Sequence, residues 1–326
     1  MTDPSTVPAI AVSGLRKSFG GRTVLDGISL QVTSGSVFSL LGPNGAGKTT
    51  AIRILTTLIR ADAGEALVAG HSVATEPDAV RAVIGVTGQF SAVDPLLTGE
   101  ENLAMMGDLN HLPRTQARRR AASLLEQFEL ADAATRLAST YSGGMTRRLD
   151  LAMSLIGQPA ILFLDEPTTG LDPRSRRTMW QVIRGLAASG VTIFLTTQYL
   201  DEADQIADRI ALLDDGTLVA HGTPGDLKRL APGGHISLRF SDAASLDAAS
   251  RALGGRVPEG TDRDSLTLQV PSDCSVASIK ALLGRFDDRA VAIDQLSIHT
   301  PDLDDVFFAL TGQSPANSDD EKATPP

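Results

Sequence analysis

Gly42-Pro43-Asn44-Gly45-Ala46-Gly47-Lys48-Thr49 is the stretch of this 326-residue chain that decides its fold. The eight residues match the pattern G-x-x-x-x-G-K-[ST] of a phosphate-binding P-loop. They follow an apolar run, Val37–Leu41, that is typical of a strand, and they open an apolar-periodic segment, Thr50–Leu58, that is typical of a helix. Glycine permits turns in which backbone N–H groups converge on phosphate oxygens, and the helix N-terminus adds partial positive charge. The stretch therefore predicts a nucleotide-binding loop, with Lys48 on the β- and γ-phosphates and the Thr49 hydroxyl on Mg²⁺.

A second apolar run ends in two carboxylates. Ile161–Leu164 is apolar throughout, as in a strand that is buried on both faces, and Asp165 and Glu166 follow it directly. Because ligands of open α/β sheets bind at the carboxyl ends of strands, we expect these side chains near the P-loop. Asp165 is then expected in the Mg²⁺ shell, and Glu166 is expected to orient or deprotonate an attacking water. The alternative is a solvent-exposed strand end followed by a helix cap.

Patterning along the chain indicates two folded units. Short apolar runs, among them Ile10–Val12 and Ser29–Val32, alternate with longer amphipathic ones over the first two thirds, which indicates an α/β fold with a largely parallel sheet. Between Glu101 and Gly157 only helical spacing occurs, which indicates a helical insert. The segment Ala231–Gly234 breaks the pattern, and a small α/β unit follows. The expected domains are 1–230, with a helical subdomain at about 90–157, then a C-terminal α/β domain at 231–312 and a disordered tail at 313–326.

The composition excludes several classes of protein. Hydrophobic residues make up 42% and charged residues 21%, so the chain can bury a sizeable core. A net charge of -10 argues against a general nucleic-acid binder, and the single cysteine, Cys274, fits a reducing cytosol. The start lacks the features of a signal peptide, and no run approaches the roughly 18 apolar residues of a membrane helix. We therefore expect a cytoplasmic protein that reaches a membrane only through a partner.

A third motif, Tyr141-Ser142-Gly143-Gly144-Met145, precedes a predicted helix that runs to Ile156. Ser142 is a good N-cap residue, so a plain capped helix would explain the motif by itself. Its place between the P-loop and the carboxylate strand, however, resembles the nucleotide-binding subunit of ATP-binding cassette (ABC) transporters. Five motifs fall in the order of that family over about residues 7–228. The resemblance implies a P-loop NTPase of the ABC cassette class, with a RecA-like mixed sheet, a helical subdomain and a small C-terminal α/β domain.

The resemblance also implies which residues contact ATP. Phe19 would stack on adenine, although a core phenylalanine before a Gly-Gly turn is the alternative. The serine and glycines of the third motif would contact the γ-phosphate held by the opposite subunit of a dimer. Asp172 would communicate across that dimer, but Asp172-Pro173 fits equally well an N-cap followed by a proline at N1. The implied ATP-binding set is Phe19, Gly42, Pro43, Asn44, Gly45, Ala46, Gly47, Lys48, Thr49, Thr50, Ser142, Gly143, Gly144 and Asp172.

The family pattern implies a catalytic set and a metal set. Glu166, Gln198 and Gln89 would be catalytic, and Thr49, Gln89 and Asp165 would hold Mg²⁺. Gln198 stands where most members carry a histidine that senses the γ-phosphate. Glutamine can donate a hydrogen bond to phosphate but has no titratable proton near neutrality, so Glu166 with electrostatic positioning must carry the chemistry. A smaller departure is Met145, where the third motif usually has glutamine.

A narrower resemblance extends to about Gly312. Gln198, Val86-Thr87-Gly88-Gln89, the motif at 141–145 and the ending Leu303–Gly312 are similar to daunorubicin/doxorubicin-resistance type ATP-binding subunits. This resemblance implies an ATPase that dimerises with a second copy, uses ATP and Mg²⁺ and binds no nucleic acid. It also implies a separately encoded integral-membrane permease, which would hold the subunit at the inner face of the cell membrane and export hydrophobic drugs, antibiotics or lipids.

Other functions fit the sequence less well. A soluble, non-transport ABC ATPase acting on ribosomes or DNA usually carries tandem cassettes, long coiled coils or basic surfaces, whereas this chain has one cassette and an acidic balance. A P-loop kinase of small molecules would leave the Ser142 motif unexplained. Import in place of export stays open, and so does the role of the C-terminal unit, in dimer contact or in regulation.

Overall fold

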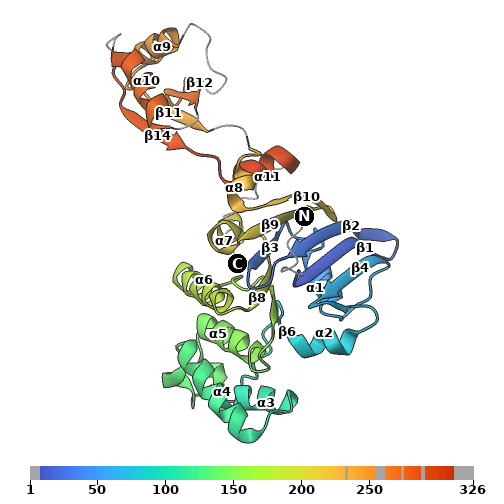
Figure 1. Ribbon diagram of the computed structural model, residues 1–326. Helices are drawn as coiled ribbons and strands as arrows, with labels where there is room; N and C mark the ends of the chain where they lie inside the picture. Colours follow the sequence, from blue (N-terminus) through green and yellow to red (C-terminus); the bar gives the residue numbers. More distant parts are fainter. Residues whose placement is uncertain (1–7, 232–233, 254–260, 273–274, 288–290, 312–326) are drawn as a thin grey trace, which may run out of the picture. The chain divides into compact units, whose positions relative to one another are not determined.

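The computed structural model describes residues 8–231, 234–253, 261–272, 275–287 and 291–311. The chain forms two compact units, residues 1–224 and 225–326 (Figure 1). The division lies shortly before residue 230, where the sequence placed the end of the first domain. The expected tail at 313–326 and Cys274 lie outside the described residues. Within the described ranges, no helix is both long and apolar enough to cross a bilayer.

The centre of the first unit is a six-stranded sheet in the order β10-β9-β3-β8-β7-β6. Its neighbours run parallel except β10, which pairs antiparallel with β9. The expected mixed sheet is therefore confirmed. Its strands are β3 (Val37–Leu41), β6 (Ile84–Thr87), β7 (Ile161–Asp165), β8 (Thr192–Thr197), β9 (Arg209–Asp214) and β10 (Thr217–Gly222).

A second sheet, antiparallel and in the order β2-β1-β4-β5, lies beside the expected largely parallel one and was not predicted from the sequence. Its strands are β1 (Ile10–Phe19), β2 (Arg22–Val32), β4 (Ala63–Val68) and β5 (His71–Ser72). The short strands expected at Ile10–Val12 and Ser29–Val32 were wrong in length, since β1 has 10 residues and β2 has 11. Buried and exposed residues mix along both strands, so an apolar run marks only one end of each. Gly14, at φ +59°, lies where the β1 register shifts and the strand continues.

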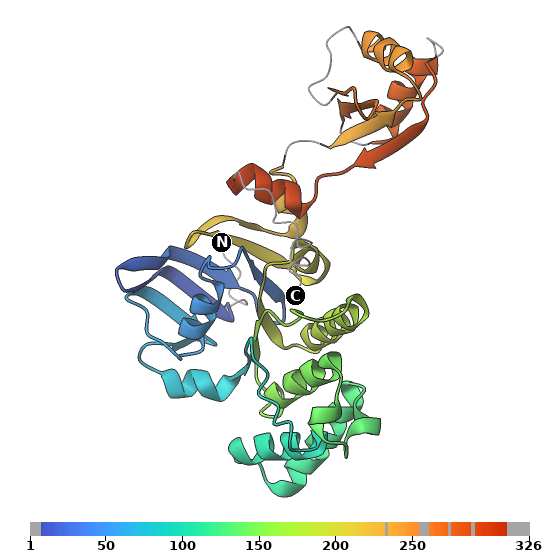
Figure 2. The same cartoon turned by 180° about the vertical axis from the view of Figure 1, so that it is seen from behind.

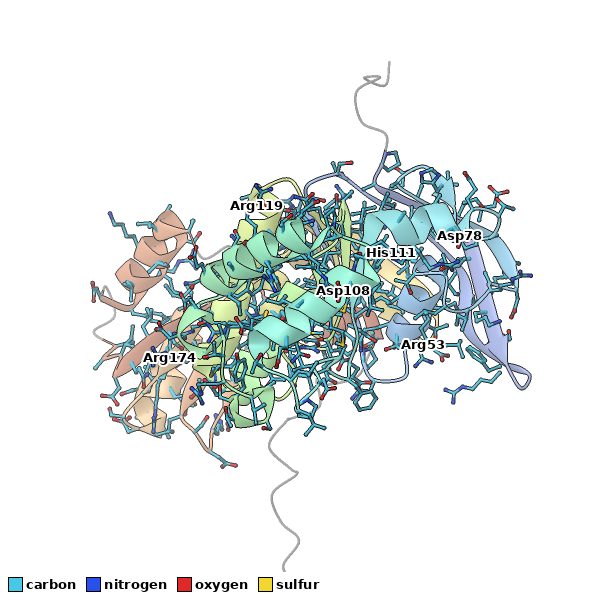
Figure 3. All side chains as sticks on the ribbon, turned by 90° about the horizontal axis from the view of Figure 1, so that it is seen from below. Arg53, Asp78, Asp108, His111, Arg119 and Arg174 are labelled. Carbon is cyan, nitrogen blue, oxygen red and sulfur yellow. The ribbon has the colours of Figure 1, made fainter. Side chains whose placement is uncertain are left out.

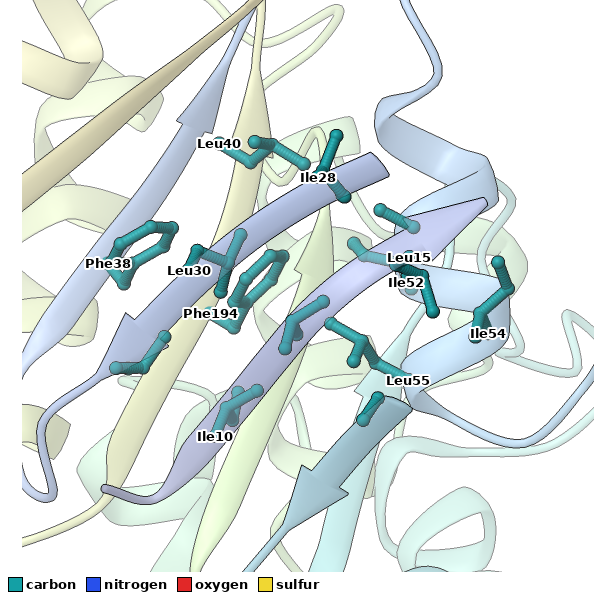
Figure 4. Close-up of a cluster of buried hydrophobic side chains, with 14 of the residues drawn as sticks. Ile10, Leu15, Ile28, Leu30, Phe38, Leu40, Ile52, Ile54, Leu55 and Phe194 are labelled. Carbon is teal, nitrogen blue, oxygen red and sulfur yellow. The ribbon is translucent and has the colours of Figure 1, made fainter. Parts of the chain in front are cut away.

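Two hydrophobic cores lie on opposite faces of the six-stranded sheet. Phe38, Phe163 and Phe194 belong to the core that β3, β7 and β8 share with α1 (Lys48–Leu55) and the antiparallel sheet (Figure 4). The Phe194 ring stacks on Phe38 with centroids 5.4 Å apart. The intervening residues, among them Leu162 and Leu164, belong to the second core, on the side of the helices. Alternation along each strand thus places α1 and the helical layer on different faces.

Helices cover the second core and extend it into a helical part. Figures 1 and 2 show the antiparallel sheet (blue) and the green helices as separate parts of the first unit. α3 (Gly99–Leu109) begins at a capping box formed by Thr98 and Glu101. Asp108 lies exposed on α3, and Arg119 lies exposed on α4 (Arg114–Gln127) (Figure 3). Residues 90–157 contain no strand, only an isolated bridge between Thr98 and Leu137. The helices of this unit are α1, α2 (Pro77–Val83), α3 (Gly99–Leu109), α4 (Arg114–Gln127), α5 (Gly143–Ser154), α6 (Pro173–Ala188) and α7 (Leu200–Ile206), with 3-10 turns at Ala131–Ala133 and Ala138–Thr140.

The second unit contains a four-stranded antiparallel sheet in the order β12-β13-β11-β14. Its core includes Ile236 and Leu238 of β11, Leu246 of α9 and Phe286 of α10, so the unit has a hydrophobic centre of its own. The strand expected at Val291–His299 begins only at Gln295. Its elements are α8 (Pro224–Lys228), β11 (His235–Arg239), α9 (Ala243–Ala252), β12 (Thr261–Asp262), β13 (Thr267–Pro271), α10 (Val276–Asp287), β14 (Gln295–His299) and α11 (Leu303–Thr311).

Candidate active site

The P-loop connects β3 to α1, as the sequence predicted. A Cβ on Gly42 would lie 2.2 Å from the carbonyl oxygen of Leu213, so only glycine fits there. Gly47 has φ +109°, and its Cβ would lie 2.7 Å from the Val24 oxygen. Among hydrogen bonds of the described residues, none is donated by the backbone N–H of Gly45, Gly47, Lys48, Thr49 or Thr50. These free donors at a helix N-terminus form a cradle that fits phosphate oxygens.

Lys48 lies inside the cradle with its side chain 5% exposed. Its Nζ donates to the carbonyl oxygens of Gly42, at 2.7 Å, and Pro43, at 3.1 Å. It also lies 3.4 Å from Glu166 Oε1. Burial lowers the pKa of Lys48, and the nearby carboxylates of Glu166 and Asp165 oppose that shift. The arrangement therefore places a buried cation at the start of the cradle.

Asp165 ends β7 on the side of the sheet that faces α1. Its Oδ1 accepts from Thr49 Oγ1 at 3.3 Å and from Thr196 Oγ1, in the neighbouring strand β8, at 2.6 Å. Asp165 is 4% exposed, so little solvent competes for its carboxylate. A hydroxyl and a carboxylate oxygen are ligands that Mg²⁺ accepts, with phosphate oxygens and waters completing its shell. Of the three residues predicted to hold Mg²⁺, Thr49 and Asp165 are therefore brought together.

Glu166 turns the chain out of β7 in a left-handed conformation, with φ +50°. Its N–H is bound by both the carbonyl oxygen and the Oγ1 of Thr196, each at 3.1 Å. Its Oε2 accepts from Thr169 Oγ1 at 3.2 Å. A non-glycine residue in this region stores conformational energy, and such strain is concentrated at functional sites. The carboxylate thus lies beside the phosphate cradle rather than at a plain solvent-exposed strand end.

The two glutamines follow strands that neighbour β7. Gln89 is exposed and comes two residues after β6, and Gln198 is half-buried and directly follows β8. Because β6, β7 and β8 are parallel neighbours, both glutamines leave the sheet at the edge where Asp165 lies. Gly42 N donates to the oxygen of Thr197, at 3.2 Å, which joins the start of the P-loop to the residue before Gln198.

The Ser142 motif forms the N-terminus of α5, among the helices, whereas α1 packs between the two sheets (Figure 1). Ser142 is the N-cap, and its Oγ accepts from Met145 N at 3.3 Å. A Cβ on Gly143 would meet nothing within 4 Å, whereas one on Gly144 would lie 2.7 Å from Ser175 Oγ in α6. Gly144 therefore has a packing reason of its own, and Ser142 and Gly143 are exposed.

For Phe19 and Asp172 the sequence left a structural role open, and the structure shows that role for Asp172 but not for Phe19. The Phe19 ring is 49% exposed at the end of β1, with Lys17 Nζ 5.2 Å from its centroid, so it is no core residue. Asp172 caps α6, because its Oδ1 accepts from Arg174 N and Ser175 N at 2.9 and 3.0 Å. The hydrogen bonds from Ser175 and Arg174 lower the pKa of the Asp172 carboxyl. Asp172 therefore has the helix-cap role within a single chain.

Comparison with known proteins decides the family. A family model described as ABC transporter matches residues 25–169. The daunorubicin resistance ATP-binding protein DrrA2 of Streptomyces coeruleorubidus is 47% identical over 318 residues, which is 97% of this chain and 98% of that protein. The chain belongs to the ABC transporter family. It is an ATP-binding subunit with ATPase activity, so the predicted family, enzyme class and ATP are confirmed.

Other relatives and solved cassettes agree with this. The doxorubicin resistance ATP-binding protein DrrA of Mycobacterium tuberculosis (strain ATCC 25618 / H37Rv) is 46% identical over 93% of this chain and of that protein. A solved ATP-binding subunit of an ABC transporter has a TM-score of 0.61 and 27% identity, covering 68% of this chain and 92% of that chain. A dimeric cassette in a post-hydrolysis state, bound to ADP and Pi, has a TM-score of 0.59 and 25% identity, covering 66% and 98%. The ABC cassette fold expected from the motifs is confirmed.

The sequence did not point to three polar residues of this ABC cassette. Thr196 bonds both carboxylate residues, and Arg147 and Asp150 of α5 form a buried ion pair at 3.2 Å next to the loops of the site. The opposite charges at i, i+3 on a helix with an apolar face were the one signal for the pair. Nothing in an apolar strand marks one threonine as bound to Asp165.

Proposed function

We propose that this ABC ATPase powers the export of a hydrophobic drug, antibiotic or lipid through a separately encoded membrane permease, at the inner face of the cell membrane. The observation that carries the proposal is the 46–48% identity to daunorubicin and doxorubicin resistance ATP-binding proteins over at least 93% of this chain. That similarity extends over nearly the whole chain and so includes the C-terminal unit, whereas the solved cassettes cover 66–68% of the chain. No observation favours ribosomes or DNA as the target.

The site supports in-line attack of water on the γ-phosphate. Backbone donors of the P-loop and Lys48 would hold the β- and γ-phosphates, and Thr49 and Asp165 would hold Mg²⁺. Held there, Mg²⁺ would supply positive charge against the negative charge that develops on the phosphates. Glu166 would orient the water and accept its proton as the bond to the leaving ADP breaks. Gln89 would reach the water and Mg²⁺ from the end of β6.

Each composite site would use two copies of the chain. Ser142 and Gly143 at the start of α5 are exposed, and α5 lies among the helices rather than at the P-loop. Two chains facing each other would let the Ser142 motif of one close over the γ-phosphate bound by the other, with Asp172 at the contact. ATP would then favour the closed dimer because only that state completes its electrostatic cage.

The segment that follows Gln89 would contact the permease. It carries two large apolar side chains with unusual exposure, Phe90 at 87% and Leu96 at 79%. Exposed apolar side chains on one short segment are typical of a protein–protein contact. Because the segment starts at Gln89, closure at the nucleotide could be transmitted to the permease through it.

Gln198 implies a particular pH dependence. A histidine at this position would titrate near neutrality, whereas the glutamine side chain has no such proton. Turnover is therefore expected to show no ionisation from this position between about pH 6 and 8. A rate profile whose limb in this range shifts in Gln198→Ala would contradict the assignment.

The test of the ATPase mechanism is Glu166→Gln in the purified full chain. The variant should bind ATP, lose turnover and form an ATP-dependent dimer in size-exclusion chromatography. Glu65→Gln, which changes an exposed glutamate on β4, is the matched control and should hydrolyse at the parental rate. Parental turnover in Glu166→Gln would show that Glu166 does not activate the water.

Export is tested in cells that carry the chain together with a gene for the proposed permease partner. The efflux rate of a fluorescent anthracycline should rise only when both are present, and Glu166→Gln should abolish the rise. Suppose that the purified chain hydrolyses ATP but that expressing chain and permease together leaves efflux unchanged. The anthracycline-type cargo would then be contradicted, but the ATPase activity would not.

A further inference from the structure

Arg147 is a buried arginine on α5, five residues after Ser142, and it is 8% exposed. Its guanidinium donates to backbone oxygens that belong to the loops of the site, not to its own helix. Nε donates to Pro167 O at 2.9 Å, and Nη2 donates to Asp165 O and Glu166 O, each at 3.1 Å. The three carbonyl groups belong to the last residue of β7 and to the turn that follows it, which carries the proposed water-activating carboxylate.

The same guanidinium reaches the loop that carries Gln89. Nη1 donates to Gly88 O at 2.9 Å and to Asp150 Oδ2 at 3.2 Å. The other oxygen of Asp150 accepts from Ala92 N at 3.0 Å. Gln89 therefore lies between two residues, 88 and 92, that are both held by this ion pair of α5.

Arg147 also helps to hold the left-handed backbone conformation at Glu166. The N–H of Glu166 is held by Thr196 from β8, and its carbonyl oxygen is held by Arg147 from α5. A non-glycine residue keeps φ near +50° only where its surroundings fix it. Contacts on both sides of the residue supply that fixation, and one of the two comes from α5.

The ion pair is costly to bury. Burial lowers the pKa of Arg147 and raises the pKa of Asp150, while each charge favours the ionised form of the other. The next residue, Arg148, differs in its partners, because it donates to Phe128 O and pairs with Glu129, both outside the loops of the site. The two adjacent arginines thus bind different parts of the cassette, and only Arg147 touches the β6 and β7 ends.

We propose that Arg147 is a positioning residue that holds Glu166 and the Gln89 loop in a fixed relation to the Ser142 end of α5. The inference rests on the proposed catalytic role of Glu166. A displacement of α5 when a second chain closes on Ser142 would then move the Glu166 carbonyl and the Gly88 carbonyl together. Hydrolysis in one site would depend on engagement of that chain's own signature motif with its partner.

The test is Arg147→Lys in the full chain, with Arg148→Lys as the matched control. A single ammonium group cannot reproduce the planar fork that reaches carbonyl groups in two loops. We expect kcat for ATP hydrolysis to fall at least about tenfold and KM to change less than about threefold, because the P-loop keeps all its contacts. Arg148→Lys should leave both constants within about twofold.

Folding is controlled by a second variant, Arg147→Gln with Asp150→Asn, which removes both buried charges together. Either of these two Arg147 variants, if it melts like the parent, should show the loss of kcat at nearly constant KM. A folded variant with parental kcat, or one in which KM rises while kcat is kept, would overturn the inference. Failure of both variants to fold would make Arg147 a requirement of the fold and would also overturn it.

The outcomes separate this inference from the proposed function. If Glu166→Gln abolishes turnover and Arg147→Lys does not lower kcat, only the positioning role is wrong. If Glu166→Gln keeps parental turnover, the catalytic assignment fails first, whatever Arg147→Lys shows.

Discussion

Thr196→Val is the most informative single change in the proposed metal site. Thr196 is fully buried in β8, and its Oγ1 donates to Asp165 Oδ1 at 2.6 Å and accepts from Glu166 N at 3.1 Å. Valine keeps the shape and removes the hydroxyl. A hydrogen bond to a charged acceptor contributes about 1.5–3 kcal/mol, and Glu166 N keeps its bond to the backbone oxygen of residue 196. The free energy of unfolding should therefore fall by about 1.5–3 kcal/mol.

The functional effect is expected on Mg²⁺. Asp165 would lose the partner that orients it, and loss of such a partner typically costs about tenfold or more in metal affinity. The Mg²⁺ concentration that gives half-maximal ATPase activity should therefore rise about tenfold, measured at saturating ATP.

Thr192→Val is the matched control on the same strand. Thr192 is also buried, but its Oγ1 accepts from Gly35 N at 2.9 Å, at the opposite end of β8. It should lose about 1–3 kcal/mol of stability, because a partly buried donor loses its partner, and keep the parental Mg²⁺ dependence. If Thr196→Val and Thr192→Val show the same Mg²⁺ dependence, Thr196 does not orient a metal ligand.

Three further predictions concern packing and burial. Gly144→Ala should lower the thermal unfolding temperature, since its Cβ would lie 2.7 Å from a serine oxygen of α6, whereas Gly143→Ala, with open space, should not. Burial raises the pKa of Glu202, which is 0% exposed, so its stabilising contribution is greatest below the ordinary value of 4.5 and is lost as pH rises. The unfolding free energy of Glu202→Gln relative to the parent should therefore increase from pH 4 to 7 in urea titrations, and a constant difference would contradict this. Phe194→Leu removes two ring contacts and should cost at least about 1–3 kcal/mol in the same titrations; a loss below about 0.5 kcal/mol would show that the rings add little.

Much of the fold and of the site could be predicted because the informative signals are local. The P-loop pattern and the carboxylates after Ile161–Leu164 each combine chemistry and secondary structure within ten residues. The antiparallel sheet was not predicted because buried and exposed residues are interspersed along β1 and β2. Only one end of each strand is an apolar run that sequence patterning can detect.

The support of the site was harder to predict for a physical reason. Arg147 binds carbonyl oxygens that lie 18 to 59 residues away in the chain, and every residue type has such an oxygen. Side-chain identity therefore carries no signal for those bonds. Trp180 is a similar case, because its ring fits the helical packing pattern while its Nε1 donates to the buried Glu202 at 3.1 Å.

Because side chains alternate along β7, the number of residues in the strand decides which face of the sheet Asp165 lies on. Ile161 and Phe163 face the α1 side, Leu162 and Leu164 face the helical side, and Asp165 therefore meets Thr49 of α1. One residue inserted within this strand would turn the Asp165 carboxylate to the face of the sheet that packs on the helices, although every residue of the motif would still be present. Loops around the cassette can grow or shrink in evolution, but the spacing within this strand can change only in steps of two.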